Sequence, residues 1–89
     1  MTEIIIYSKD ICPYCNKAKT LLNRKIANFS QKKISLTEIK IDSDSKKTEM
    51  IEKSGGRMTV PQIFINGKHV GGCDDLYLLD SEGKLDNLL

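Results

Sequence analysis

The sequence predicts an α/β fold with a four-stranded mixed sheet flanked by three helices. A short apolar strand at Ile4–Tyr7 precedes a segment with helical periodicity, and the pair Asn66–Gly67 interrupts a later apolar run as hairpin turns do. Between them lie one further strand pattern and one short helix pattern. The order is therefore βαβ, helix, β-hairpin and helix, in which the first two strands are expected to be parallel.

The first helix is expected to begin at Pro13, directly after Cys12. Proline suits the first helical position because its missing N–H has no partner there in any case. The apolar residues that follow have helical spacing, and they are Ala18, Leu21, Leu22, Ile26 and Phe29. This spacing predicts one face buried against the sheet.

The second strand has an ambiguous pattern. Ile34 and Leu36 alternate in one phase, and Ile39 and Ile41 alternate in the other. We expect either a bulge or a late strand start, and the interpretation adopted is a strand over about residues 35–41.

Polar clusters and glycines mark the remaining boundaries. Residues 42–45 supply helix caps, 46–53 form a short second helix, and 54–56 end it. Residues 62–65 and 69–70 are the strands of the hairpin. A last helix is expected to begin at Asp74–Asp75 and to end near Gly83, and residues 84–89 are expected to add a final turn.

Length and composition favour a single domain over residues 1–89, without repeats. The 14 basic and 12 acidic residues give a net charge of +2, so we do not expect a nucleic-acid partner. No secretory signal and no membrane-spanning run is found, so we expect a cytoplasmic protein that inserts in no membrane. Three cysteines are too few for a disulfide scaffold, and a close pair in a reducing compartment indicates catalysis or metal binding.

The segment Cys12-Pro13-Tyr14-Cys15 has the features of a redox site. Backbone N–H groups at a helix start stabilise an anion, and in such motifs they lower the thiol pKa from about 8.5 to roughly 3.5–7.5. A low pKa mainly makes Cys12 a good leaving group. Cys15, almost one turn later, is expected to be more covered and to resolve a mixed disulfide. The alternative is that both thiols only fill a core.

Two later motifs are candidates for the rest of the site. Thr59-Val60-Pro61 precedes the hairpin, where proline begins a strand or marks a bend. In the segment 71–74, two glycines lead into an acidic helix start, so that free N–H groups could hold a carboxylate and Asp74 an ammonium. A flexible turn with Asp74 as N-cap explains the same segment equally well.

With these motifs together, the chain resembles a dithiol glutaredoxin of the small bacterial type over nearly its full length. The motifs are Cys-Pro-Tyr-Cys at 12–15, Thr-Val-Pro at 59–61 and Gly-Gly-Cys-Asp-Asp at 71–75. The resemblance implies a thioredoxin-like fold and a glutathione-dependent oxidoreductase that reduces protein disulfides and glutathionyl mixed disulfides. It implies glutathione as reducing co-substrate and no tightly bound cofactor. We expect a monomer, and ribonucleotide reductase is one possible protein partner.

The resemblance also implies a set of glutathione contacts. Val60-Pro61 would be cis, with the Val60 backbone pairing with the cysteinyl part of glutathione. Beside Gly72, the N–H groups of Cys73 and Asp74 would hold the γ-glutamyl carboxylate, with the Asp74 side chain near the α-ammonium. Lys9, Tyr14 and Thr59 match positions along the groove, and Arg57 matches a basic residue that faces the glycyl carboxylate.

The chain departs from the family pattern in two segments. Residues 27–36 are longer than expected, which would enlarge a loop far from the site. Residues 54–57 carry an extra residue, and this makes Arg57 the least secure of the implied contacts.

A metal site is the main alternative for the cysteines. Cys12, Cys15, His69 and Cys73 are ligand types that can form a tetrahedral zinc site, but the two pairs lie too far apart in sequence for a compact zinc module. Some relatives of the family bind an iron-sulfur cluster, which Pro13 and Tyr14 disfavour here. No metal is therefore assigned. His69 is expected on the hairpin surface, and the backbone of Cys73 is expected to matter more than its thiol.

Overall fold

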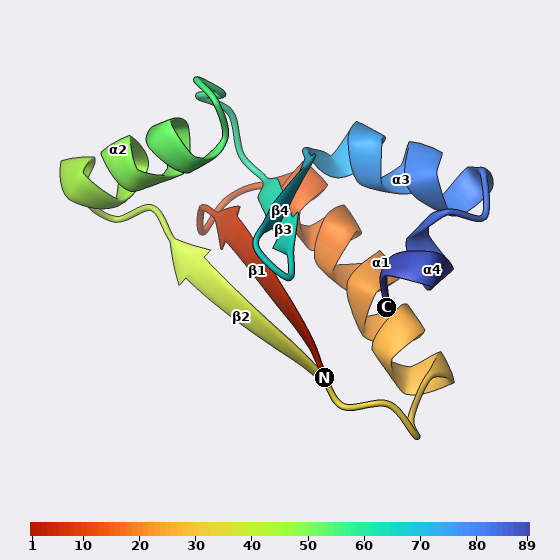
Figure 1. Ribbon diagram of the computed structural model, residues 1–89. Helices are drawn as coiled ribbons and strands as arrows, with labels where there is room; N and C mark the ends of the chain where they lie inside the picture. Colours follow the sequence, from red (N-terminus) through yellow and green to blue (C-terminus); the bar gives the residue numbers. More distant parts are fainter.

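The computed structural model describes residues 1–89, and it contains one four-stranded sheet between two unequal helical layers (Figure 1). The elements are β1 (Thr2–Ser8), α1 (Pro13–Asn28), β2 (Ile34–Lys40), α2 (Asp44–Lys53), β3 (Gln62–Ile65), β4 (Lys68–Gly71), α3 (Cys73–Ser81) and α4 (Leu85–Leu88). The expected order and the three longer helices are confirmed. The expected final turn is the short helix α4, which makes the helix count four.

The sheet has the strand order β2-β1-β3-β4. β1 pairs parallel with β2, and β1–β3 and β3–β4 are antiparallel. The mixed sheet is thereby confirmed. Asn66 and Gly67 both have positive φ in the two-residue turn of the hairpin, as the Asn-Gly pair predicts.

The prediction that β2 needs a bulge or a late start is wrong. β2 begins at Ile34 and pairs with β1 in unbroken register from Thr2↔Ile34 to Ser8↔Lys40. Its two apolar phases arise because both faces of the strand are covered: Ile34 and Leu36 pack on the α1 side, and Ile39 packs on the α2 side. The register shift lies instead between β3 and β4.

Two helices start earlier than the sequence patterns suggest. α2 begins at Asp44 because the Ser43 hydroxyl accepts the N–H of Lys46 and caps the helix. α3 begins at Cys73 with Gly72 as its N-cap, so Asp74 and Asp75 lie within its first turn.

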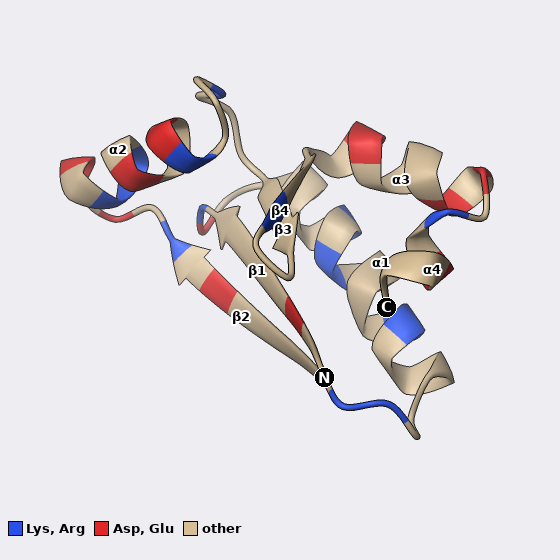
Figure 2. Cartoon of the chain, viewed as in Figure 1, with Lys and Arg blue, Asp and Glu red and all other residues tan.

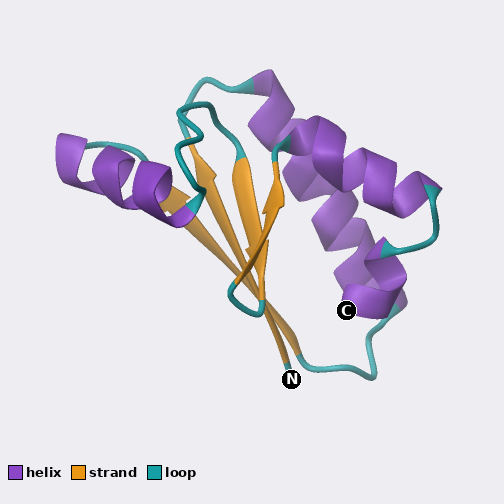
Figure 3. Cartoon of the chain, turned by 45° about the horizontal axis from the view of Figure 1, so that its top comes forward, coloured by secondary structure: helices purple, strands orange, loops and turns teal.

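The two faces of the sheet carry cores of different size. On one face, α1, α3 and α4 cover a cluster of eleven buried residues that includes Ile4, Leu22 and Leu76. On the other face, Tyr7, Met50 and Phe64 form a small cluster, and α2 lies on that side of the sheet, apart from the other helices (Figure 3). None of the helices combines the length and the apolar character needed to cross a membrane.

This architecture gathers the predicted motifs at one end of the sheet. The loop from β1 to α1, the loop from α2 to β3 and the start of α3 meet there (Figure 1). The longer segment between α1 and β2 lies at the opposite end, where the N–H of Thr2 donates to the carbonyl of Lys33. That lengthening therefore stays away from the candidate site.

Candidate functional site

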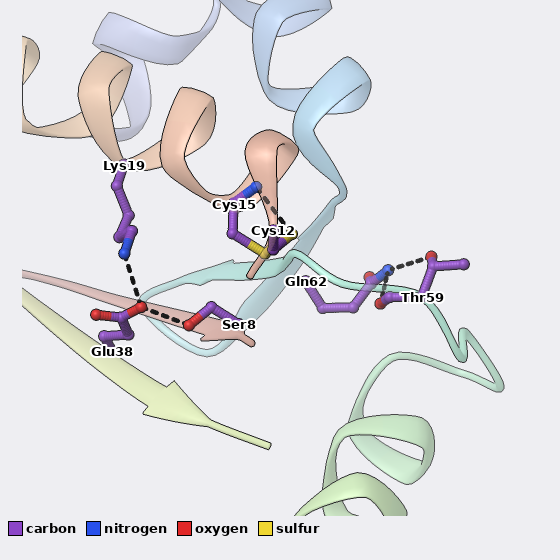
Figure 4. The surroundings of a disulfide bond; sticks show 7 residues. All are labelled: Ser8, Cys12, Cys15, Lys19, Glu38, Thr59 and Gln62. Atoms are coloured by element: carbon purple, nitrogen blue, oxygen red, sulfur yellow. Dashed lines mark hydrogen bonds and ion pairs between the residues drawn. A yellow bond between two sulfur atoms is a disulfide. The ribbon is translucent and has the colours of Figure 1, made fainter. Parts of the chain in front are cut away.

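Cys12 and Cys15 form a disulfide at the start of α1, with 5.2 Å between their Cα atoms (Figure 4). Cys12 is the N-cap, and its sulfur accepts the N–H of Cys15 at 3.1 Å. Cys12 retains 9% of its accessible surface, and Cys15 retains none. The expectation that Cys15 is the more covered of the two cysteines is confirmed.

A groove of about 170 Å³ includes Tyr14, the residue directly before Cys15, in its wall, whereas Cys12 and Cys15 are not lining residues. Its walls come from three segments: Tyr14 at the start of α1, then Arg57, Thr59, Val60 and Pro61 of the loop before β3, and Gly72, Cys73, Asp74 and Asp75 at the start of α3. Eight of these nine residues were singled out from the sequence. The Val60–Pro61 peptide bond is cis, as the resemblance implied.

Arg57 and Lys9 have different positions relative to this groove. Arg57 lines it despite the extra residue before it, because Gly55 and Gly56 turn the chain there with φ of +70° and +103°. Lys9 is exposed, forms no ion pair and is not a lining residue.

Asp75 is a groove residue that was not among the predicted ligand contacts. Its Oδ2 accepts the N–H of Gly72 at 2.8 Å and lies 3.3 Å from Nη2 of Arg57. The Gly72 hydrogen bond, and after it the Arg57 guanidinium, hold the pKa of this carboxyl below its ordinary value. Its position in the first turn after Gly72 was the available signal, since an acid at N3 reaches back to the N-cap amide.

Gly71 must be glycine for this carboxylate to lie where it does. Its φ is +120°, and a Cβ at this position would overlap the carboxylate of Asp75. The glycine therefore permits both the backbone conformation and the close approach of Asp75 to Gly72.

Gln62 supports the loop that forms the opposite wall. This fully buried side chain donates to the carbonyl of Thr59 at 3.1 Å and to its hydroxyl at 3.3 Å. Its oxygen lies 2.7 Å from Nε2 of His69. His69 lies on the hairpin as expected but is only partly exposed: its ring packs on Phe64, and burial lowers its pKa. A glutamine in a strand pattern gave no signal of this role.

Cys73 contributes little reactive surface to the groove. It is buried, and burial raises the pKa of its thiol. This agrees with the expectation that its backbone matters more than its sulfur. No three histidine, cysteine, aspartate or glutamate side chains come together in a way that could hold a metal ion.

A polar cluster lies near the disulfide on the α1 side of the sheet (Figure 4). Glu38 on β2 accepts from the hydroxyl of buried Ser8 and from Nζ of Lys19 at 2.9 Å. Lys19 lies one helical turn after Cys15, on the same side of α1. The Ser8 hydrogen bond and then Lys19 hold the pKa of Glu38 below its ordinary value, so the carboxylate is charged at neutral pH.

Comparison with known proteins agrees with this geometry. Residues 4–70 match the family model described as Glutaredoxin. Glutaredoxin 3 of Escherichia coli strain K12 is 51% identical over 89 residues, which span all of this chain and 99% of the relative.

Solved structures with a similar fold include two glutaredoxins. The solution structure of glutaredoxin from Brucella melitensis is 50% identical with a TM-score of 0.78, covering all of this chain and 89% of the other. The crystal structure of a buckwheat glutaredoxin-glutathione complex is 30% identical with a TM-score of 0.82, and the match covers 99% of this chain and 76% of the other.

Proposed function

This chain belongs to the glutaredoxin family of glutathione-dependent thiol-disulfide oxidoreductases, and on that premise we propose that Cys12 is the nucleophile and Cys15 the resolving thiol. The observation that supports this division is the difference in burial: Cys12 retains 9% of its accessible surface, and Cys15 retains none. In the reduced protein, the helix N-terminus and the N–H of Cys15 stabilise a thiolate on Cys12.

Each substrate class has its own route through this pair. With a glutathionylated protein, the Cys12 thiolate takes the glutathionyl group, and the protein leaves as a thiolate that solvent protonates. A second glutathione then releases glutathione disulfide and restores Cys12. With a protein disulfide, Cys12 forms a mixed disulfide, Cys15 displaces the reduced protein, and two glutathiones reduce the Cys12–Cys15 bond that results.

We assign glutathione to the groove beside Cys12. The Val60 backbone pairs with its cysteinyl part, and the N–H groups of Cys73 and Asp74 bind the γ-glutamyl carboxylate. Arg57 lines the groove as the cation for the glycyl carboxylate. The buckwheat relative was solved as a glutathione complex, which supports glutathione as the ligand.

The side chains around these backbone contacts complete the proposal. Tyr14 and Thr59 border the ligand, and Gly72 leaves room for it. Asp74 offers its carboxylate to the α-ammonium, and Asp75 accepts the Gly72 amide beside it. Lys9 stays a predicted contact on the exposed loop before Cys12.

Glutathione acts as co-substrate and no cofactor is assigned. Protein disulfides and glutathionylated proteins are the proposed partners of a cytoplasmic monomer, and ribonucleotide reductase is one candidate.

Substitution of each cysteine tests the division of labour. Cys12→Ser should abolish activity on both substrate classes. Cys15→Ser should retain reduction of a glutathionylated substrate and lose reduction of a protein disulfide. Equal loss of deglutathionylation in both variants would contradict the assignment of Cys15.

The electron source tests the family-level assignment. Steady-state reduction of the mixed disulfide of glutathione and mercaptoethanol should proceed with glutathione and glutathione reductase. Thioredoxin reductase should not replace them. Turnover with thioredoxin reductase alone would reassign the site to thioredoxin-type chemistry.

A further inference from the structure

Three large apolar side chains are exposed on the two segments that carry Cys12 and Thr59. Ile11, directly before Cys12, is 94% exposed; Tyr14, between the cysteines, is 61% exposed; and Met58, directly before Thr59, is 64% exposed. The other large apolar residues with comparable exposure are Met1 and Leu78, so three of the five belong to the two segments that carry Cys12 and Thr59.

These three side chains do not serve the core. None of them belongs to either hydrophobic cluster or packs against one. Exposed apolar groups that gather in one place and are bordered by polar residues mark an interaction surface. Here the polar border includes the ion pair between Asp10 and Lys40, whose charged atoms are 2.7 Å apart.

The place of Ile11 and Met58 indicates what they contact. The glutathionyl half of a mixed disulfide is assigned to the groove, where Tyr14 is a lining residue and Ile11 and Met58 are not. The protein half must continue from the Cys12 sulfur outside the groove. Ile11 is joined to Cys12, and Met58 to Thr59, with about 3.8 Å between neighbouring Cα atoms. Both residues are therefore exposed on the two segments that adjoin the place where the protein half must lie.

We propose that Ile11 and Met58 form a docking surface for protein substrates whose reactive cysteine is flanked by apolar residues. Ile11 is joined to Cys12, where every substrate disulfide must react. We therefore assign this surface to the segment of the substrate protein that flanks its reactive cysteine. The proposal rests on the proposed function and adds a substrate class to it. The chemical step is unchanged: Cys12 takes the glutathionyl group, the peptide leaves as thiolate, and glutathione is the reductant.

The test compares two glutathionylated peptides that differ only beside their single cysteine, with leucine on both sides in one and serine in the other. The wild-type protein should favour the leucine peptide by about tenfold in kcat/KM, which corresponds to partial burial of one or two aliphatic side chains. In the double variant Ile11→Thr/Met58→Gln this ratio should fall to about two or less. The ratio corrects for any general change in activity.

Leu78→Gln is the matched control. Leu78 is 58% exposed on α3 and lies outside the groove, so its replacement should leave the ratio near the wild-type value. Equal kcat/KM for the two peptides, or a double variant that keeps the preference, would overturn the proposal. All variants should unfold at wild-type temperature, because the changed side chains are exposed.

Two further measurements distinguish a substrate-docking surface from a loss of the basic reaction and from a dimer interface. Turnover of the small mixed disulfide of glutathione and mercaptoethanol establishes the proposed function, and its absence would refute that function rather than the docking surface alone. Sedimentation should give a monomer. A dimer that the two substitutions dissociate would assign the surface to a second copy of the chain and overturn the substrate assignment.

Discussion

Asp74 and Asp75 are neighbours at the start of α3, but different contacts hold them. Asp75 is fixed by the Gly72 amide and by Arg57, whereas the Asp74 side chain is exposed and makes no hydrogen bond within the chain. Both line the groove. At the residue scale, Asp75 maintains the loop that presents the backbone N–H groups, and Asp74 is free to meet a ligand.

Replacement of Asp74 should weaken the use of glutathione. Asp74→Ala removes a charged contact, and a hydrogen bond to a charged group contributes about 1.5–3 kcal/mol, so KM for glutathione should rise roughly tenfold or more. The rate at which iodoacetamide alkylates Cys12 should not change. Unaltered kinetics with glutathione would exclude Asp74 from the groove's ligand contacts.

Asp75 should affect how stability depends on pH. Its folded pKa lies below the ordinary 3.8, so its stabilising contribution is present above that value and is lost as the pH falls from about 4 through the folded pKa. In urea titrations below roughly pH 4, Asp75→Asn should flatten the fall in the free energy of unfolding. Arg57→Met should flatten it less, since the Gly72 amide is the larger cause. The reverse ranking would contradict this account.

The buried thiol of Cys73 should be unreactive in the reduced protein. Burial raises its pKa, so the thiol stays protonated at neutral pH, whereas Cys12 is placed to form a thiolate. With iodoacetamide near pH 7, mass spectrometry of peptides should find Cys12 labelled and Cys73 unlabelled. Labelling of both cysteines at similar rates would contradict the burial argument.

At the scale of elements, three helices are joined by one lysine. Lys25, in the last turn of α1, lies 2.7 Å from Oδ1 of Asp80 on α3 and 2.8 Å from Oδ1 of Asp86 on α4. Figure 2 shows acidic residues at the ends of α3 and basic residues along α1. The Tyr77 hydroxyl also donates to the carbonyl of Lys17, which gives α1 and α3 a second connection. These contacts hold the middle and the C-terminal end of α3 against α1, and the same helix carries one wall of the groove at its start.

Removal of this lysine should destabilise the fold. Lys25→Met keeps most of the apolar stem but leaves two carboxylates unpaired, and we expect a loss of about 1–2 kcal/mol in the free energy of unfolding, reduced by the partial exposure of Asp86. Lys84→Met is the matched control, because Lys84 has only a long contact of 3.6 Å to Glu82 at the surface. Equal effects of the two substitutions in urea unfolding would contradict the role of Lys25.

At the scale of the whole molecule, the two faces of the sheet are not equally anchored. α1 contributes three buried residues, Ala18, Leu21 and Leu22, to the large core, whereas α2 contributes only Met50 to the small one. The loop that follows α2 carries Arg57 and Thr59–Pro61, so the less anchored side of the molecule also supplies one wall of the groove.

Hydrogen exchange should reflect this inequality. The amides of α2 should exchange through local opening at a lower free energy than those of α1, because fewer apolar contacts must be broken. Mass spectrometry of exchanged peptides should therefore find α2 deuterated well before the Leu21–Leu22 segment of α1. Equal protection of the two helices would indicate that the small cluster anchors α2 as firmly as the large one anchors α1.

Much of the fold followed from local patterns. The period of the apolar residues in α1, the Asn-Gly turn and the caps near α2 and α3 are short-range signals, and each element they predicted is present. The predictions that failed concern residues whose burial depends on elements distant in the sequence. β2 looked irregular because no sequence period reveals that both of its faces are covered. The exposure of His69 was overestimated because its partner Gln62 lies on the neighbouring strand.

The sequence by itself determined the reactive pair and the identity of most groove residues, because contiguous motifs place Cys12 at a helix start and supply Val60-Pro61 and Gly71–Asp74. Only the tertiary structure decided how these segments meet. It brought Asp75 onto Gly72 and Arg57, placed Gln62 behind Thr59, and left Ile11 and Met58 uncovered. Some of these features are contacts between residues far apart in the chain, and the exposure of Ile11 and Met58 depends on which side chains the core leaves out. Neither long-range contacts nor exposure of this kind produces a periodic pattern along the sequence.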